Sequence, residues 1–246
     1  MKFLQSLERK FRSVRNNYRR KVQNKILKDR WAAKPTKQPV VENFDVTGLD
    51  RCVIHFINLK HRKDRKIEIL AELTRLGISD FTRFDAVADQ NGALGCARSH
   101  AQLLEGAQIS KDQLFMICED DCQFIMDRIA IDVLIEEFFF NPHLDVLCLA
   151  YNATNSFQIS QTLMITSDTQ TTSCYIVKPQ AIGMVLGCAL KSVCHLSLGE
   201  PGYDFAIDQV WKELQSEIYF ALPKDPYAVQ RPSFSDIENS YQNYGL

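Results

Sequence analysis

Apolar residues in this chain gather in two kinds of run, short continuous ones and longer ones with helical spacing. The run CVIHFINL at 52–59 is rich in β-branched and aromatic side chains, which predicts a buried strand. Across 63–76 apolar residues recur every three positions, which predicts a helix, and Gly77 suits the left-handed residue that follows a helix end. The chain therefore begins its folded part as a strand followed by a helix.

The same alternation continues toward the C-terminus. Strands interleaved with helices indicate an α/β fold with a mostly parallel sheet and helices on both of its faces. In such sheets ligands bind beyond the carboxyl ends of the strands, so this edge is where chemistry is expected. Further strands are expected at 81–84, 114–118, 146–150, 173–177 and 218–222, and further helices at 98–107, at 129–139, from Pro179 onward and at 205–214.

Residues 1–37 differ from the rest in charge. Thirteen Lys and Arg stand against two acids there, a net charge of +11, and because the whole chain carries -1 the remainder carries -12. Within 1–34 apolar residues recur at spacings of three and four, which predicts a basic amphipathic helix. We expect an arm with its linker at 1–37 and one domain at 46–246. The apolar positions of the arm are Leu4, Leu7, Phe11, Val14, Tyr18, Val22 and Ile26.

The arm has more than one interpretation. A basic amphipathic helix suits an anionic membrane surface, where each basic residue adds about 1 kcal/mol. A partner helix, nucleic acid or plain solvent would also accept it. No run of about eighteen apolar residues occurs and the N-terminus lacks a secretory apolar core, so we expect no transmembrane helix and a cytosolic protein. The eight cysteines lie mostly within apolar runs, which favours reduced structural thiols.

The strand expected at 114–118 runs directly into Glu119, Asp120 and Asp121. Ionised carboxylates cannot stay unpaired in an apolar core, so a cation is expected beside them. Because side chains alternate along a strand, Glu119 and Asp121 should share one side and Asp120 the other. Two hard oxygen ligands suit magnesium or manganese, with substrate phosphates completing the shell. The simpler alternative is a solvated acidic turn.

Two further segments are expected at the same edge of the sheet. In NLKHRKDR, which follows the first strand, Arg62 and Arg65 lie three apart and could hold phosphate oxygens from one face. GALGCARSH at 92–100 would enter a helix through a glycine loop whose free amides can receive an anion. His100 could hydrogen-bond a nucleotide or fill a structural role. Neither a dinucleotide-binding glycine motif nor a P-loop occurs, so a phosphate site would be built differently.

Taken together, these motifs resemble glycosyltransferase family 25, which includes bacterial lipooligosaccharide galactosyltransferases and procollagen galactosyltransferases. The resemblance covers about 50–240 and implies a GT-A type nucleotide-binding fold. It also implies a nucleotide-sugar donor, most often UDP-galactose, a divalent metal, commonly manganese, and inversion at the anomeric carbon. The segments that carry it, in order, are NLKHRKDR, FTRFDAV, GALGCARSH, the strand with EDD, TTSCYIVKPQAIGMVL, AIDQVW and VQRPSFSDIE.

The resemblance implies roles for particular positions. Glu119 and Asp121 would frame the metal motif, with Asp120 inside it. Asp208 in AIDQVW would be the general base for the acceptor, although Ala206 replaces the proline usual in the family. Further positions expected at the nucleotide sugar are Asn58, Arg62, Arg65, Asp85, Ser99 and His100, and Ser235 and Asp236 match a C-terminal element that would close over the donor.

The sequence therefore predicts an inverting, metal-dependent glycosyltransferase that moves a hexose, with galactose expected, to a saccharide acceptor of lipooligosaccharide or a similar surface glycan. In this chemistry a carboxylate takes the proton of the acceptor hydroxyl while the metal neutralises the leaving diphosphate. The arm would hold the enzyme on the cytoplasmic face of a membrane, and no nucleic acid partner is expected. The alternative is a non-catalytic nucleotide-sugar-binding or scaffold protein recruited to membrane or nucleic acid by its arm.

Overall fold

The computed structural model describes residues 18, 20–34, 48–235 and 240–242. Its main sheet has eight strands: β1 (Cys52–Asn58), β2 (Thr82–Asp85), β3 (Leu114–Glu119), β5 (Val146–Cys148), β6 (Asn152–Gln158), β7 (Leu163–Gln170), β8 (Cys174–Val177) and β9 (Phe220–Pro223). The helices of the domain are α2 (Lys63–Arg75), α3 (Gly92–Glu105), α4 (Arg128–Phe140), α5 (Ile182–Ser197), α6 (Gly202–Phe205) and α7 (Ile207–Leu214), with short 3-10 turns at Gly48–Arg51 and Pro179–Ala181. Two small ribbons pair β4 (Cys122–Phe124) with β10 (Ala228–Gln230) and β11 (Ser233–Ser235) with β12 (Ser240–Gln242).

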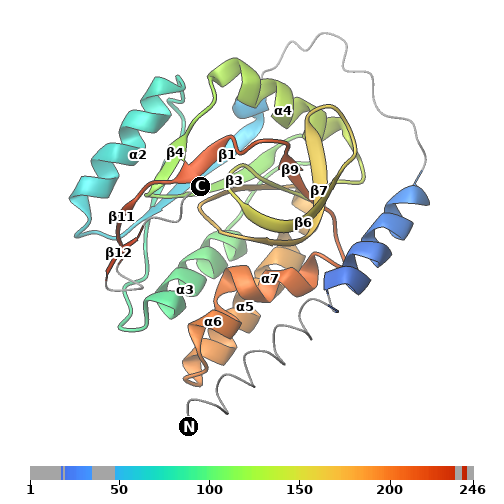
Figure 1. Ribbon diagram of the computed structural model, residues 1–246. Helices are drawn as coiled ribbons and strands as arrows, with labels where there is room; N and C mark the ends of the chain where they lie inside the picture. Colours follow the sequence, from blue (N-terminus) through green and yellow to red (C-terminus); the bar gives the residue numbers. More distant parts are fainter. Residues whose placement is uncertain (1–17, 19, 35–47, 236–239, 243–246) are drawn as a thin grey trace.

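The α/β prediction is confirmed, because the structure is a mixed α/β domain with a large, mostly parallel sheet. The strand order is β2-β1-β3-β8-β5-β9-β7-β6 (Figure 1). β1 pairs in parallel with β2 and β3, and β5 pairs in parallel with β9. β8 runs against β3 and β5, and β7 runs against β9 and β6. Six of the eight strands therefore point one way, and the carboxyl ends of β1, β2 and β3 lie side by side.

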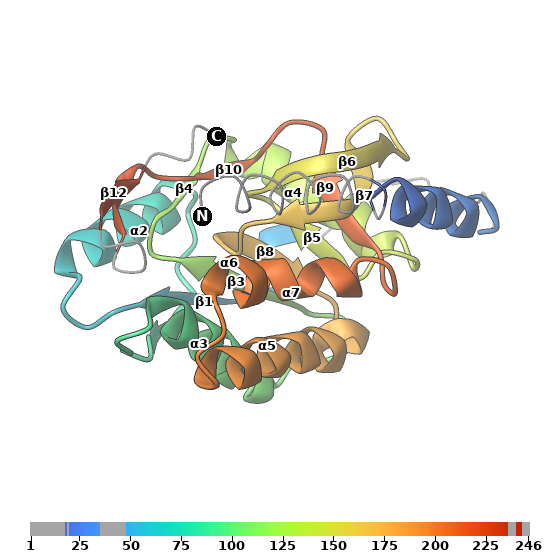
Figure 2. The same ribbon diagram turned by 60° about the horizontal axis from the view of Figure 1, so that its bottom comes forward.

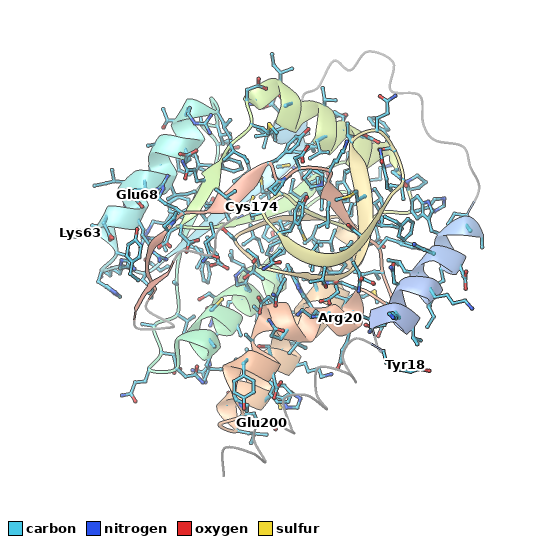
Figure 3. All side chains as sticks on the ribbon, in the orientation of Figure 1. Tyr18, Arg20, Lys63, Glu68, Cys174 and Glu200 are labelled. Carbon is cyan, nitrogen blue, oxygen red and sulfur yellow. The ribbon has the colours of Figure 1, made fainter. Side chains whose placement is uncertain are left out.

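Helices cover both faces of the sheet, which gives three layers (Figure 2). On one face α2 and α4 pack their apolar residues, among them Leu73 and Phe138, against the sheet. On the other face α3, α5 and α7 contribute a second apolar cluster that includes Leu104 and Trp211. Cys174, labelled in Figure 3, lies in β8 between these layers and is fully buried. The sheet is thus buried on both sides, as its apolar strands require.

Element boundaries differ from expectation at two places that later matter. Helix α3 begins at Gly92 rather than near residue 98, because the Asn91 side chain accepts from the Leu94 amide at 3.4 Å and caps the helix. Gly95 is required within it, since a Cβ there would lie 2.5 Å from the Val87 carbonyl oxygen. The helix expected at 205–214 is split at Ala206, whose backbone is extended.

The β6–β7 hairpin was not predicted. β6 reads NATNSFQ, a polar sequence whose residues alternate between exposed and half-buried positions at the edge of the sheet. Such an edge strand lacks the continuous apolar run that marks the central strands. The hairpin places Asp168 of β7 in a buried position, where the Thr154 hydroxyl donates to it at 2.7 Å.

The cysteine prediction holds for most of the eight. Five are buried, Cys52 and Cys96 are half-buried, and Cys194 is exposed on α5, contrary to expectation. All eight lie within 48–235 and all are free thiols. By length and composition alone, Pro179–Ser197 could cross a membrane. In this fold, however, its Val185 and Ala189 are buried in the apolar cluster shared with α3 and α7.

The basic arm is helical over 20–32, and this helix lies beside β7 (Figures 1 and 2). It docks through Leu27, which is 1% exposed, and through Trp31, whose ring lies 5.3 Å from that of Tyr219. Arg20 forms an ion pair with Asp168. The expected apolar stripe is not the docked face, because its described members are exposed. These members are Tyr18, Val22 and Ile26.

The docked face gives a stability prediction. Leu27→Ala should lower the free energy of unfolding by about 2–5 kcal/mol, because it leaves a cavity between the arm and the domain. The neighbouring Ile26→Ala is the matched control, since Ile26 is 46% exposed and its loss should change stability by less than about 0.5 kcal/mol. Urea unfolding followed by tryptophan fluorescence measures both. Equal effects of the two substitutions would contradict the docking.

Candidate functional site

A cleft of about 880 Å³ opens at the carboxyl edge of the sheet. This is the edge at which parallel α/β sheets bind ligands. Its walls come from the ends of β1 and β3, the start of α3, the β7–β8 connection and the start of α7. Among the described lining residues, the charged side chains other than histidine are Arg65, Asp89, Glu119, Asp120, Asp121 and Asp208.

Two of the three adjacent acids share one cation. Asp120 accepts a hydrogen bond from Asn58 Nδ2 at 2.7 Å, and its Oδ1 lies 3.0 Å from Arg65 Nη1. The same Arg65 nitrogen lies 3.2 Å from Asp121 Oδ2, which also accepts from Gln230 Nε2 at 3.0 Å. The expected alternation across the strand is therefore wrong, because β3 ends at Glu119 and the next two residues form the turn to β4. We call 119–121 the acid bend.

Glu119 makes different contacts from its two neighbours. Its Oε1 accepts from the Thr172 hydroxyl at 2.6 Å and lies 3.4 Å from His100 Nε2. The other ring nitrogen of His100 is 2.9 Å from the Tyr175 hydroxyl, and the His100 side chain is fully buried. Burial alone would raise the pKa of Glu119, but His100, the Thr172 hydroxyl and the charge of Arg65 together outweigh it, and the pKa lies below its ordinary value.

The cleft carries an excess of negative charge. Burial, followed by the charge of Glu119, raises the pKa of Asp121 to about 7, and burial also raises the pKa of Asp120. Arg65 is the only Lys or Arg among the described lining residues, against five carboxylates. The donor set of hard oxygens and this residual charge fit a divalent cation such as manganese or magnesium.

The acid bend alone does not surround one point. Of its three carboxylates, only Glu119 belongs to a set of three ligand-type side chains, within the described residues, whose donor atoms lie within 4.8 Å of one another. A hard ion held at the bend would therefore take much of its shell from water or from substrate phosphates, as magnesium commonly does.

Asp208 stands at the first turn of α7, on the wall formed by that helix. Its Oδ2 accepts from the Thr171 backbone amide at 3.3 Å, and its Oδ1 lies 3.4 Å from Gln209 Nε2. Burial raises the pKa of Asp208 above its ordinary value, so this carboxylate is a stronger base than an exposed one. Ala206 stands two residues earlier, where the resemblance leads us to expect proline, yet the Asp208 side chain still lines the cleft.

Thr171, which holds Asp208, has a strained backbone with φ of 86°. It is the only non-glycine residue with positive φ in the described part of the chain, and a β-branched residue is poorly suited to that region. Such strain costs about 1–3 kcal/mol and gathers at functional sites. The β7–β8 connection thus positions Asp208 at the expense of stability.

Relieving this strain should stabilise the protein. Asparagine tolerates positive φ better than threonine, so Thr171→Asn should raise the free energy of unfolding by about 1 kcal/mol. Thr82→Asn is a control on exposed edge strand β2, where φ is negative and the change should be neutral or slightly destabilising. Chemical denaturation distinguishes the two, and a destabilised Thr171→Asn variant would show that the threonine side chain outweighs the strain.

The remaining expected residues fall into two groups. Ser99 and His100 line the cleft beside the acid bend. Asn58 is buried behind it, 1% exposed, and supports Asp120. Arg62 instead lies 2.9 Å from Asp64, and Asp85 is 70% exposed and lies 2.6 Å from Arg83, so neither lines the cleft.

Ser235 belongs to β11, and Asp236 lies outside the described residues.

Sequence reasoning missed several cleft residues. Asp89 follows β2 and forms an ion pair with Arg98 at 2.6 Å. A strand-to-helix connection at the carboxyl edge of the sheet could have drawn attention to it. Thr171 and Thr172 lie in the short connection from β7 to β8, two strands that are not neighbours in the sheet, and Gln230 comes from β10. No spacing in the sequence marks these three, because they meet the cleft acids only through long-range contacts in the fold.

Comparison of the sequence with protein-family models and with curated proteins finds no match. Among solved structures, UDP-glucose pyrophosphorylase complexed with UDP-glucose is similar with a TM-score of 0.42 and 9% identity, over 69% of this chain and 72% of that one. A glycosyltransferase involved in glycosylation of the major capsid of PBCV-1 is similar with a TM-score of 0.39 and 12% identity, over 76% and 96%. With TM-scores below 0.5, these likenesses carry no argument about family or activity.

Proposed function

We propose that the protein is a metal-dependent glycosyltransferase that moves a hexose from a nucleotide sugar, with UDP-galactose as the first choice, to a saccharide acceptor with inversion. One observation carries the proposal. The acid bend and Asp208 line one cleft at the carboxyl edge of the sheet, so an acidic cation site and a separate basic carboxylate could serve one substrate. The sequence resemblance to glycosyltransferase family 25 supports the same function.

The residues divide the work by position. Glu119 and Asp121 would hold a manganese or magnesium ion, which would neutralise the charge of the leaving diphosphate. Arg65 holds Asp120 and Asp121 in place, and its positive charge would lie beside the phosphates of the donor. Asp208 would take the proton of the attacking acceptor hydroxyl, a step that its raised pKa favours near neutral pH.

A donor screen tests this function. The full chain is mixed with UDP-galactose, UDP-glucose or GDP-mannose, with manganese or with EDTA, and thermal unfolding and nucleotide release are followed. One UDP-sugar at about a hundred times its dissociation constant should stabilise the protein by about 2.7 kcal/mol, with manganese only. Slow release of UDP should accompany it. Binding without release on any saccharide acceptor would favour a non-catalytic binding protein, and no binding of any donor would refute the proposal.

The proposal also places the enzyme on the cytoplasmic face of a membrane, near a lipid-linked acceptor. Tyr18, Val22 and Ile26 form an apolar stripe that the domain does not cover, and Lys21 and Lys25 beside them are exposed. This arrangement suits the interface of an anionic bilayer. Vesicles with and without phosphatidylserine, and duplex DNA of equal charge, separate the alternatives. Binding to anionic vesicles only is expected, and stronger binding to DNA would contradict it.

A further inference from the structure

We propose that Cys96, His100 and Glu119 form a binding site for a thiophilic divalent cation such as zinc on the wall of the cleft. Cys96 and His100 stand four residues apart on α3, so helix geometry places both on one face. Glu119, at the end of β3, faces them across the sheet edge. Their donor atoms all lie within 4.8 Å of one another. One sulfur, one imidazole nitrogen and one carboxylate oxygen are therefore gathered at a single point.

The separation of the His100 and Glu119 donor atoms matches tetrahedral coordination. His100 Nε2 and Glu119 Oε1 lie 3.4 Å apart, which is longer than a typical N–H···O hydrogen bond. Two ligands at about 2.05 Å from a tetrahedral zinc ion are separated by about 3.4 Å. The His100 and Glu119 donor atoms are thus already separated by the distance that two ligands of a tetrahedral zinc ion require. A thiolate at about 2.3 Å from zinc needs about 3.6 Å to each partner, so the Cys96 sulfur, which lies within 4.8 Å of both, has to close by at most about 1.2 Å.

The surrounding contacts orient both ligands as a metal site requires. The Tyr175 hydroxyl oxygen, 2.9 Å from His100 Nδ1, can accept a hydrogen bond from Nδ1–H, which leaves the lone pair of Nε2 for the metal. The Thr172 hydroxyl holds Glu119 at 2.6 Å. All three ligands line the cleft, so a fourth coordination position would face the opening. Three protein ligands with one open position are typical of accessible zinc sites.

Ligand type and charge select the metal. Thiolate and imidazole favour zinc over magnesium and manganese, which prefer all-oxygen shells. A thiolate and a carboxylate together neutralise a divalent ion, so the site would carry no net charge in its half-buried position. Glu119 is shared with the acid bend. Zinc bound here would therefore remove a carboxylate from the proposed manganese site and inhibit transfer, a consequence that rests on the proposed function.

A second thiol cluster supplies the matched control. A further set of three thiols also has its sulfur atoms within 4.8 Å of one another, but all three are fully buried in the apolar cluster that includes residues of α2 and α4. These residues are Cys118, Cys122 and Cys174. They offer no position open to the cleft. Replacing one of them removes a thiol from the same protein and leaves the side chains of Cys96, His100 and Glu119 in place.

Cobalt(II) is the direct probe, because a cobalt–thiolate bond gives a charge-transfer absorption that oxygen ligands do not. The reduced full chain should bind one equivalent with this band, and zinc should displace it. Cys96→Ser, or Cys96→Ala if the serine variant fails to fold, should abolish the band and weaken zinc binding about tenfold or more. Cys118→Ser should retain both. No band in the parent chain, or a band that survives in the Cys96 variant and is lost in Cys118→Ser, would overturn the site.

Inhibition is measured separately, as the ratio of manganese-dependent turnover with and without micromolar zinc. The ratio should fall in the parent chain and change little in Cys96→Ser. Turnover in a protein that shows no cobalt band would refute the zinc site but would still support the proposed function. A cobalt band in a protein that turns over no donor would support the zinc site and refute the proposed function. Turnover that zinc leaves unchanged despite the band would remove the competition for Glu119.

Discussion

Asp208→Asn should lower kcat by about 10²- to 10⁴-fold, because a general base contributes about that much and an amide cannot take the acceptor's proton. The amide can still accept the hydrogen bond that the Thr171 backbone donates, so the fold and the cleft should be preserved. Donor KM should change little, since Asp208 is proposed to act on the acceptor. Steady-state release of UDP with manganese and saturating acceptor measures the effect.

Glu213→Gln is a control on the same helix. Glu213 lies at the outer end of α7, half-exposed and paired with Lys191 at 2.6 Å, and an exposed ion pair of this kind is worth about 0–1 kcal/mol. Its substitution should leave kcat within about twofold. A drop of less than about tenfold in Asp208→Asn would mean that another group takes the proton. An equal drop in both variants would mean that damage to α7 is the cause.

Asp121→Asn should stabilise the metal-free protein at neutral pH while abolishing manganese-dependent turnover. The pKa of Asp121 is raised to about 7 by burial and by the charge of Glu119, so ionising this carboxyl costs stability in the folded state. Asparagine has nearly the same shape, and its amide oxygen can still accept from Arg65. Over about three pKa units the gain amounts to about 4 kcal/mol in the metal-free state.

The pH dependence identifies the cause. Below an unfolded-state pKa of about 4, Asp121 is protonated in both states and costs nothing. Between about 4 and 7 the unfolded chain loses this proton while the folded chain keeps it, so the free energy of unfolding falls as pH rises, and above about 7 the full cost remains. Urea unfolding in EDTA from pH 4 to 8 should show the difference between variant and parent growing across that range. A constant difference, or a destabilised variant at pH 8, would contradict it.

Much of the fold was predictable because the central strands are apolar throughout. β1, β3 and β8 were placed within a residue or two, since strands buried on both faces leave continuous apolar runs. The edge strand β6 leaves no such run and was missed. The acid bend was found because charged residues after a buried strand stand out in the sequence.

The arrangement around the bend depends on long-range contacts that no local pattern records. Gln230 reaches Asp121 from a strand more than a hundred residues later. Asp85 was expected at the nucleotide sugar from the family resemblance, yet its side chain pairs with Arg83, and Asp89 lines the cleft instead. Thr171 carries its strained backbone in the short connection from β7 to β8. These features follow from the order of strands in the sheet.

The docked arm bears on any shortened version of this protein. Asp168 in β7 is 5% exposed, and besides Arg20 of the arm its only described cation is Lys212 at 3.4 Å. A chain that started at residue 48 would lack Arg20, the ion-pair partner of Asp168. It would also expose the apolar surface of the domain against which Leu27 packs. It would aggregate more readily, and α7, which carries both Lys212 and Asp208, would lose a neighbour that steadies it. Kinetic measurements should therefore use a chain that keeps the arm.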